Sequence, residues 1–311
     1  MKKSVFARSF AILLISCIFC SILSGCGSSS KSSSSEPPVY SPLRVLVPEA
    51  PGSDTLGSSP LTLDVSNITQ GYFAAQSDSA DLVTSLQITT PTGVLYSYFI
   101  EPGENAVIPF TEGDGDYTVV GYQQIQGDQY AALYSETLTV ELENEFLPFL
   151  YPNQYVNFSP DSEASKLALS MVSEDTSDID ALKQIYNYVV NNLSYDYDKA
   201  ETVETGYLPD VDETLSTKTG ICFDYAALTT AMLRSCDIPC KLQIGYTGDI
   251  KHAWIDVYIR SKGWVTNAVS FNGDSWSLMD PTFDSSADSD DSEAIQDYIG
   301  NADNYTVQFT R

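Results

Sequence analysis

Residues in the C-terminal half of the chain have types and positions suited to nucleophilic catalysis. Cys222 follows a turn at Thr219-Gly220 and opens an expected helix over residues 222–235. The free N–H groups and positive dipole of a helix N-terminus favour a thiolate and can also hold an oxyanion. Because a free thiol titrates near about pH 8.5, catalysis at neutral pH needs a base, usually an imidazole. The chain has one histidine, His252.

His252 begins an expected strand in which successive side chains face opposite sides. Trp254 would share the face of His252, so the imidazole points away from the aliphatic layer. A catalytic imidazole is normally oriented by a carboxylate or amide, and Asp280, after the next expected hairpin, is the candidate. The residues expected to face the core are Ala253, Ile255, Val257 and Ile259.

Several short motifs in a fixed order resemble the core of the transglutaminase-like superfamily. The resemblance covers roughly residues 179–283 and implies that Cys222 is the nucleophile, His252 the base and Asp280 the orienting residue. It also implies a transglutaminase/papain-like α+β fold, with a central helix packed on an antiparallel sheet. The segments that carry it are Gly220-Ile-Cys-Phe-Asp-Tyr-Ala226, Leu233-Arg-Ser-Cys-Asp-Ile-Pro239, Lys251-His-Ala-Trp-Ile-Asp-Val257, Gly263-Trp264 and Asp280-Pro-Thr282.

This sequence departs from the family pattern in two places. The interval between His252 and Asp280 is longer than the family's, with an added turn at 271–276, and Asp237 replaces a glycine before Ile238-Pro239. The first departure bears on the role of Asp280. The alternative to catalysis is that Cys222 and His252 are core residues of a silent surface module that binds protein or cell-wall partners.

The expected reaction is cysteine hydrolysis or acyl transfer at peptide or carboxamide bonds through a thioester. Tyr195 is the candidate for a second oxyanion donor, whereas Asp224 and Trp254 are expected to be structural. Water as second substrate gives a peptidase or amidase, a lysine amine gives protein cross-linking, and we favour hydrolysis. The expected substrate is a protein or peptide, including cell-wall peptides, and no cofactor is expected.

The N-terminus has the features of a bacterial lipoprotein. Residues 1–25 combine early basic residues with an apolar stretch too short for a comfortable membrane span, which predicts a secretory signal peptide. Leu23-Ser-Gly-Cys26 resembles a lipobox and implies that Cys26 carries the lipid. Residues 26–41 then form a flexible, serine-rich linker. We expect a protein anchored to the outer face of a bacterial membrane; the alternative is a soluble secreted protein.

Length and charge limit the remaining classes. The chain of 311 residues is too long for one ordinary domain and has a net charge of −27. Such acidity argues against nucleic acid and anionic lipid as partners. We expect a monomer that contacts the membrane only through its lipid anchor.

Residues 42–146 are expected to form an all-β domain. Short apolar runs alternate with Gly, Pro, Asp and Asn turns, as at 61–65, 82–88, 117–122 and 137–142. Asp114-Gly-Asp-Tyr117 before a strand is similar to the tyrosine corner of immunoglobulin-like domains. We therefore predict an immunoglobulin-like sandwich, and favour a spacer over an adhesin or ligand-binding module.

Residues 147–311 are expected to form the catalytic α+β domain. Apolar residues recur at helical spacing from Ile179 to Leu193, with Ser177 or Asp178 as N-cap. After the helix at 222–235, strands are expected at 241–246, 253–260, 263–271 and 275–279, with a hairpin turn at Asn272-Gly273.

Two further features of this domain have alternative interpretations. Cys236 and Cys240 could approach disulfide distance if the chain turned sharply, but we favour free thiols. The acidic segment 284–293 could bind calcium, but it lacks the residue spacing of an EF-hand loop, so we favour a solvated loop.

Overall fold

The computed structural model describes residues 36–39, 43–103, 105–266, 269–272, 275–278 and 305–311. These described residues belong to one compact unit. The signal segment, Cys26, Asp280 and the acidic segment 284–293 lie outside the described residues. Among the described residues, no helix has the length and apolar character needed to cross a membrane.

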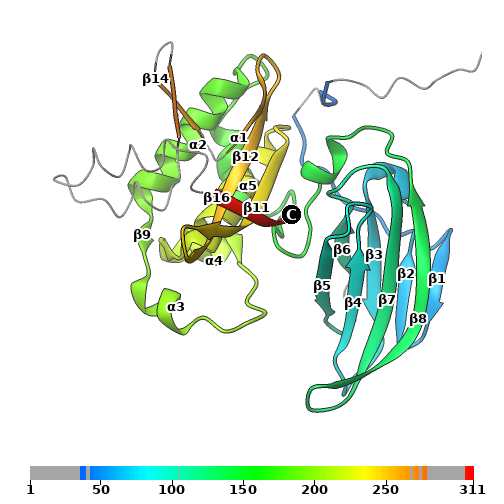
Figure 1. Ribbon diagram of the computed structural model, residues 1–311. Helices are drawn as coiled ribbons and strands as arrows, with labels where there is room; N and C mark the ends of the chain where they lie inside the picture. Colours follow the sequence, from blue (N-terminus) through cyan, green and yellow to red (C-terminus); the bar gives the residue numbers. More distant parts are fainter. Residues whose placement is uncertain (1–35, 40–42, 104, 267–268, 273–274, 279–304) are drawn as a thin grey trace, which may run out of the picture. The chain divides into compact units, whose positions relative to one another are not determined.

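The N-terminal part of the described chain consists of two four-stranded antiparallel sheets (Figure 1). One sheet has the order β1-β2-β3-β6 and the other β5-β4-β7-β8. Apolar residues from both sheets, among them Phe73, Leu86 and Val119, form a single buried core. The strands are β1 Thr55–Ser58, β2 Leu61–Asp64, β3 Tyr72–Ser77, β4 Thr84–Thr89, β5 Leu95–Ile100, β6 Asn105–Pro109, β7 Gly115–Gln126 and β8 Gln129–Val140, with 3-10 helices at Ile68–Gln70 and Leu147–Phe149.

Tyr117 closes a local turn at the start of β7. Its hydroxyl donates to the carbonyl of Gly113 (2.8 Å) and accepts from the backbone N–H of Glu112 (3.2 Å). This is the bond pattern expected of a tyrosine corner, in which the hydroxyl bonds backbone a few residues upstream. The Tyr117 ring is buried, so burial raises the pKa of its hydroxyl.

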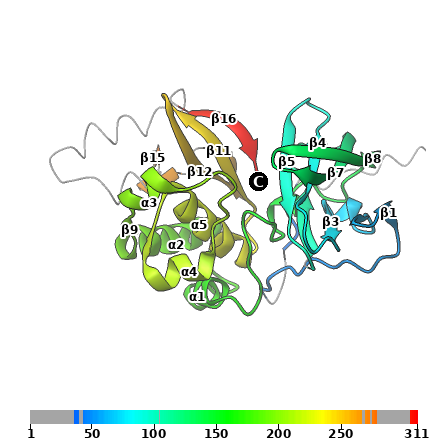
Figure 2. The ribbon, with the colours of Figure 1, turned by 90° about the horizontal axis from the view of Figure 1, so that it is seen from below.

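Within the described residues, the C-terminal part combines helices α1 to α5 with a four-stranded sheet of order β13-β12-β11-β16. In Figure 2 the helices α2, α4 and α5 lie on one side of β11 and β12. The helices are α1 Glu163–Met171, α2 Asp178–Asn192, α3 Tyr197–Thr202, α4 Val211–Thr217 and α5 Cys222–Ser235. The strands are β9 Ser194–Tyr195, β10 Thr219–Gly220, β11 Cys240–Thr247, β12 Ile250–Ile259, β13 Gly263–Val265, β14 Val269–Asn272, β15 Ser275–Leu278 and β16 Tyr305–Thr310.

Helix α5 is the central helix of this part. Every residue from Asp224 to Ser235 is buried, and Ala226, Ala227 and Ala231 allow close packing against neighbouring elements. A helix buried on all sides must be apolar around most of its circumference, which explains its low charge. Its bounds confirm the expected helix over 222–235, and α2, capped by Ser177, confirms the expected preceding helix.

The structure corrects two local predictions. The segment 263–271 was expected to be one strand, but β13 pairs with β12 whereas β14 pairs with β15 in a separate two-stranded sheet. Strand β14 therefore forms its backbone hydrogen bonds with β15 and does not extend the pairing of β13 with β12. Thr219-Gly220 was expected to be a turn, but both residues form β10, which pairs in parallel with β9.

Candidate active site

Cys222 is the first residue of α5 and is half-buried at the edge of the helix and sheet core. Ile221 precedes it as N-cap in extended conformation. The first four N–H groups of an α-helix have no partner within the helix, and they carry the positive end of its dipole. The position therefore supplies the exposure and the electrostatic environment that a nucleophilic sulfur requires.

His252 lies on β12, opposite Gly245 of β11, and its side chain is 5% exposed. Its ring stacks on Trp254 with centroids 6.3 Å apart and lies 6.4 Å from the ring of Tyr305. The other face of the strand packs with α5 in one core, through Ala253, Ile255, Val257 and Ile259. The predicted alternation of faces along this strand is thus confirmed.

The fold brings the elements that carry Cys222 and His252 together, since α5 packs against β12. Cys222 borders the core to which Ala253 belongs, and His252 directly precedes Ala253, on the other face of the strand. Pairing of the sulfur with the imidazole remains a prediction, and Asp280 lies outside the described residues.

Tyr195 lies beside the segment that leads into Cys222. Strand β9 pairs with β10 so that Tyr195 is opposite Gly220, and the N–H of Asp196 donates to the carbonyl of Gly220 (2.9 Å). The half-buried Tyr195 ring packs against Tyr197 (4.9 Å between centroids). The parallel pairing therefore holds Tyr195 beside Gly220, which lies two residues before the candidate nucleophile Cys222. The role of Tyr195 as an oxyanion donor stays a prediction.

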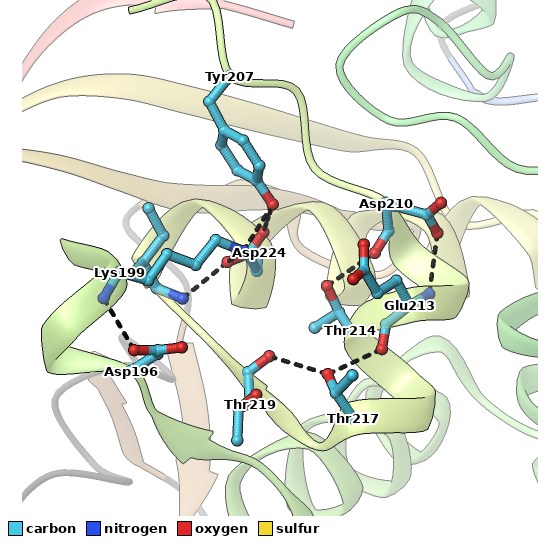
Figure 3. A network of polar contacts seen from close by, with 10 residues as sticks. Asp196, Lys199, Tyr207, Asp210, Glu213, Thr214, Thr217, Thr219 and Asp224 are labelled. Carbon is cyan, nitrogen blue, oxygen red and sulfur yellow. Dashed lines mark hydrogen bonds and ion pairs between the residues drawn. The ribbon is translucent and has the colours of Figure 1, made fainter. Parts of the chain in front are cut away.

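A network of polar contacts surrounds the first turn of α5 (Figure 3). The Asp224 carboxylate is fully buried and accepts from the N–H of Ile221 (2.8 Å), from Lys199 Nζ (2.8 Å) and from the Tyr207 hydroxyl. Lys199 Nζ also contacts the Tyr207 hydroxyl (2.7 Å). Three donors from three places in the chain thus meet one buried carboxylate.

This network changes the pKa values of its members. Burial and the hydrogen bond to Asp224 raise the pKa of Tyr207 to about 12. Burial by itself would lower the pKa of Lys199, but the hydrogen bonds to Asp224 and Tyr207 outweigh it, so the pKa is raised. At neutral pH Lys199 is therefore a cation and Tyr207 a neutral donor.

Gly220 allows the network to close. A Cβ at this position would lie 2.6 Å from the Cβ of Asp224 and 3.0 Å from its Oδ2. Real Cβ contacts are not that short, so a larger residue would displace either the Asp224 carboxylate or β10. The glycine of the Gly-x-Cys segment is thus needed for the approach of the Asp224 side chain.

Helix α4 leads into the same segment and is anchored by its own cap. The Asp210 carboxylate accepts from the backbone N–H of Glu213 (2.9 Å). The Thr217 hydroxyl lies within hydrogen-bond distance of the carbonyl oxygens of Glu213 (2.9 Å) and Thr219 (3.5 Å). These contacts, drawn in Figure 3, fix the end of α4 next to β10. They limit how far the chain before Cys222 can move.

Cys236 and Cys240 are free thiols, as favoured by the sequence, and both are buried. Burial and the nearby Asp237 charge raise the pKa of Cys236 to about 12. Burial also raises the pKa of Cys240 to about 12. Of the three cysteines in the described ranges, Cys222 alone is partly exposed.

Asp224 is expected to be structural from its place beside the Gly-x-Cys motif, but nothing in the sequence marks Lys199 or Tyr207 as its partners. Both lie in the segment between β9 and α4, where short turns follow a six-residue helix. No periodicity or motif marks these two residues, because Asp224 lies 25 residues after Lys199 and 17 residues after Tyr207. The tertiary fold alone reveals their contact with Asp224.

Comparison with known families agrees with this geometry. Residues 165–281 match the model of the transglutaminase-like superfamily, a stretch that includes Cys222, His252 and Asp280. Residues 165–281 are therefore similar to a transglutaminase-like core.

Individual relatives match only in part. The UPF0252 protein MJ1282 of Methanocaldococcus jannaschii is 40% identical over 62 residues, which is 18% of this chain and 18% of that protein. Protein YebA of Bacillus subtilis is 24% identical over 183 residues, 51% of this chain and 25% of YebA. The chain thus spans a quarter or less of these relatives.

Among solved structures, a candidate cysteine protease from Cytophaga hutchinsonii is similar to this chain. It shares 15% identity with this chain, with a TM-score of 0.36 over 78% of this chain and 72% of the other.

Proposed function

We propose that this protein is a cysteine hydrolase or acyltransferase that acts on peptide or carboxamide bonds. The observation that carries the proposal is the half-exposed Cys222 at the N-terminus of a buried helix, in a transglutaminase-like core whose strand β12 bears the sole histidine. Cys222 is the nucleophile, His252 the acid and base, and Asp280 the residue that orients His252.

The reaction proceeds in two halves. The Cys222 thiolate attacks the carbonyl carbon, a C–S bond forms, and the C–N bond breaks as the His252 imidazolium gives its proton to the departing amine. Water, deprotonated by His252, then attacks the thioester and releases a carboxylic acid and the thiolate. An amine in place of water gives a new amide by the same steps.

The oxyanion formed in both halves needs donors in place before the attack. The N–H groups at the start of α5 supply one side. Tyr195, held opposite Gly220 by the pairing of β9 with β10, is the proposed donor on the other side. A Tyr195→Phe variant should slow turnover with little change in KM, because the oxyanion exists only after attack.

We favour hydrolysis over transfer to a lysine amine. A carboxamide-bearing peptide incubated with the protein and a primary amine distinguishes the two by mass spectrometry. Hydrolysis converts the carboxamide to a carboxylic acid, with gain of water and loss of ammonia, whereas transamidation replaces that ammonia with the added amine. Dominant amine incorporation would identify a cross-linking enzyme instead.

The pH dependence of Cys222 alkylation tests the proposed nucleophile. In the full-length chain, labelling of the Cys222 peptide by iodoacetamide should stay fast well below about pH 8.5 and slow in His252→Ala. Labelling that follows an ordinary thiol, unchanged in His252→Ala, would favour a silent binding module. Cys236 and Cys240 serve as internal references because both are buried.

We also propose that the protein is anchored by a lipid on Cys26 at the outer face of a bacterial membrane, with the N-terminal sheets forming an immunoglobulin-like spacer. The tyrosine-corner contacts of Tyr117 and the shared core of the two sheets support the latter. Fatty-acid labelling that persists in Cys26→Ser would contradict the anchor. Cleavage by external protease on intact cells would support the location.

A further inference from the structure

Asp224 places a buried negative charge in the same helix turn as the candidate nucleophile. It is the third residue of α5, with Cys222 the first, and its side chain is fully buried. A carboxylate in the same helix turn as a thiolate opposes ionisation of the sulfur, because like charges repel. An unbalanced charge here would weaken the stabilisation of a thiolate by the helix start.

Lys199 supplies the balancing charge from a different element. Its Nζ lies 2.8 Å from Asp224 Oδ2, and its side chain is 31% exposed. The Lys199 backbone N–H is fixed by Asp196 Oδ1 (2.9 Å), and its ammonium lies 4.4 Å from the centroid of the Tyr207 ring. The ammonium is therefore held in one place rather than free to leave for solvent.

The Asp224 carboxylate also has a structural role at the start of α5. Asp224 accepts from the N–H of Ile221, which fixes the residue immediately before Cys222. Helix N-termini commonly use an acidic residue at this position to bond back to the N-cap N–H. An aspartate that caps the helix but opposes the thiolate requires a cation beside it.

We propose that Lys199 is a positioning residue for Cys222: its ammonium neutralises the buried Asp224 carboxylate, so that the first turn of α5 is fixed and can also hold a negative sulfur. The inference rests on the proposed function, because it concerns the ionisation of the same nucleophile. Tyr207 completes the arrangement as a neutral donor to Asp224.

Other titratable groups lie on the elements packed around this helix turn and could contribute to its pH dependence. On α5 itself Tyr225 is buried, and its ring lies 6.5 Å from that of Tyr195 on β9. The groups to be considered among the described residues are Tyr195, Asp196, Asp198, Tyr207, Asp210, Asp212, Glu213, Tyr225 and His252. The Lys199 and Asp224 variants leave all of these groups unchanged.

The test measures the alkylation rate of Cys222 in the full-length chain against pH, by mass spectrometry of its peptide. Lys199→Met should raise the midpoint of the profile by about one pH unit, since it leaves Asp224 without a counterion. Lys199→Arg should restore most of the wild-type profile because it keeps the charge. In Lys199→Met with Asp224→Asn, which removes both charges, the midpoint should return most of the way.

Lys166→Met is the matched control. Lys166 forms an exposed ion pair with Glu163 on α1, and neighbouring Ser165 contacts Ser235 at the far end of α5. The variant changes the net charge equally but should leave the Cys222 profile in place. An equal shift in Lys166→Met and Lys199→Met would overturn the proposal, because it would show a general charge effect.

Two outcomes separate the failure of this inference from that of the proposed function. An ordinary thiol profile in the wild type, unchanged in His252→Ala, would remove the proposed function itself. A wild-type midpoint at low pH that Lys199→Met leaves unmoved would overturn the role of Lys199 alone. If circular dichroism shows that Lys199→Met is unfolded, Asp224→Asn decides: it should lower the midpoint, and an unmoved midpoint overturns the proposal.

Discussion

The two ends of helix α5 each present a cysteine, but in opposite environments. At the N-terminal end Cys222 is half-buried beside a fixed polar network, whereas Cys236, just past the C-terminal end, is 5% exposed. The dipole of a helix favours negative charge at its start and opposes it at its end. One helix thus separates a thiol suited to chemistry from a thiol suited to packing.

At the C-terminal end of α5, the buried Arg234 side chain binds nearby carbonyl groups. Its guanidinium donates twice to the carbonyl of Cys240 (3.0 and 2.8 Å), to that of Tyr151 (2.7 Å) and to that of Arg311 (2.9 Å). Burial lowers the pKa of Arg234 to about 10. A cation near the end of a helix complements its dipole, and here it also joins separate strands and loops.

The largest expected difference between the two ends is in thiol reactivity. In the native full-length chain at pH 8, iodoacetamide should modify Cys222 about a thousandfold faster than Cys236 or Cys240. Burial raises the pKa of both buried thiols to about 12. Only about one in ten thousand would then be ionised at pH 8.

Peptide mass spectrometry over a time course measures these rates. In denaturant all three thiols should react at similar rates, which serves as the control. Comparable native rates for Cys222 and Cys236 would show that the two ends of α5 do not differ as described.

Loss of Arg234 should cost stability rather than reactivity. Arg234→Met nearly keeps the length of the side chain but removes four hydrogen bonds to three carbonyls, those of Cys240 and Arg311 being buried. We expect the free energy of unfolding to fall by about 3–5 kcal/mol, because bonds from a charged donor are strong and buried acceptors are left without it. Urea unfolding followed by tryptophan fluorescence measures the change.

Lys166→Met is the control for this loss, and its free energy of unfolding should change by less than about 0.5 kcal/mol, since the ion pair is exposed. In folded Arg234→Met the pH profile of Cys222 alkylation should equal that of the wild type. A change of under about 1 kcal/mol would mean that Arg234 does not hold this end of the helix.

The sequence predicted the helix and the alternation of β12 because both depend on local signals. A helical stretch with few charges and strict alternation at 253–259 were sufficient to place Cys222 and His252 on their elements. Lys199 and Tyr207 could not be predicted, because they reach Asp224 through the tertiary fold. The pairing of β9 with β10 escaped prediction too, since two-residue strands carry no periodicity.

Adding one methyl group at Gly220 should disturb the N-terminal end alone. In Gly220→Ala the new Cβ would meet the Asp224 side chain at 2.6 Å, so we expect a loss of about 1–3 kcal/mol and several-fold slower labelling of Cys222. Gly103→Ala is the control, because Gly103 has a φ of +85° and open space around it. It should lose stability through backbone strain but leave Cys222 labelling unchanged. Unaltered labelling in Gly220→Ala would show that the position of β10 does not affect the reactivity of Cys222.

The smallest expected effect concerns Tyr207, which adds a neutral donor to the network. Tyr207→Phe removes its bond to Asp224 and should cost about 0.5–1.5 kcal/mol at pH 7. Because the pKa of Tyr207 rises from 10.0 to about 12 in the folded protein, its contribution is complete below pH 10 and is lost as pH rises through 12. The stability gap between wild type and Tyr207→Phe, measured by urea unfolding at pH 7, 9, 10 and 11, should therefore shrink only above pH 10. A gap that stays constant would show that Tyr207 does not enter the folded state as a neutral donor, and that Lys199 holds the Asp224 carboxylate without it.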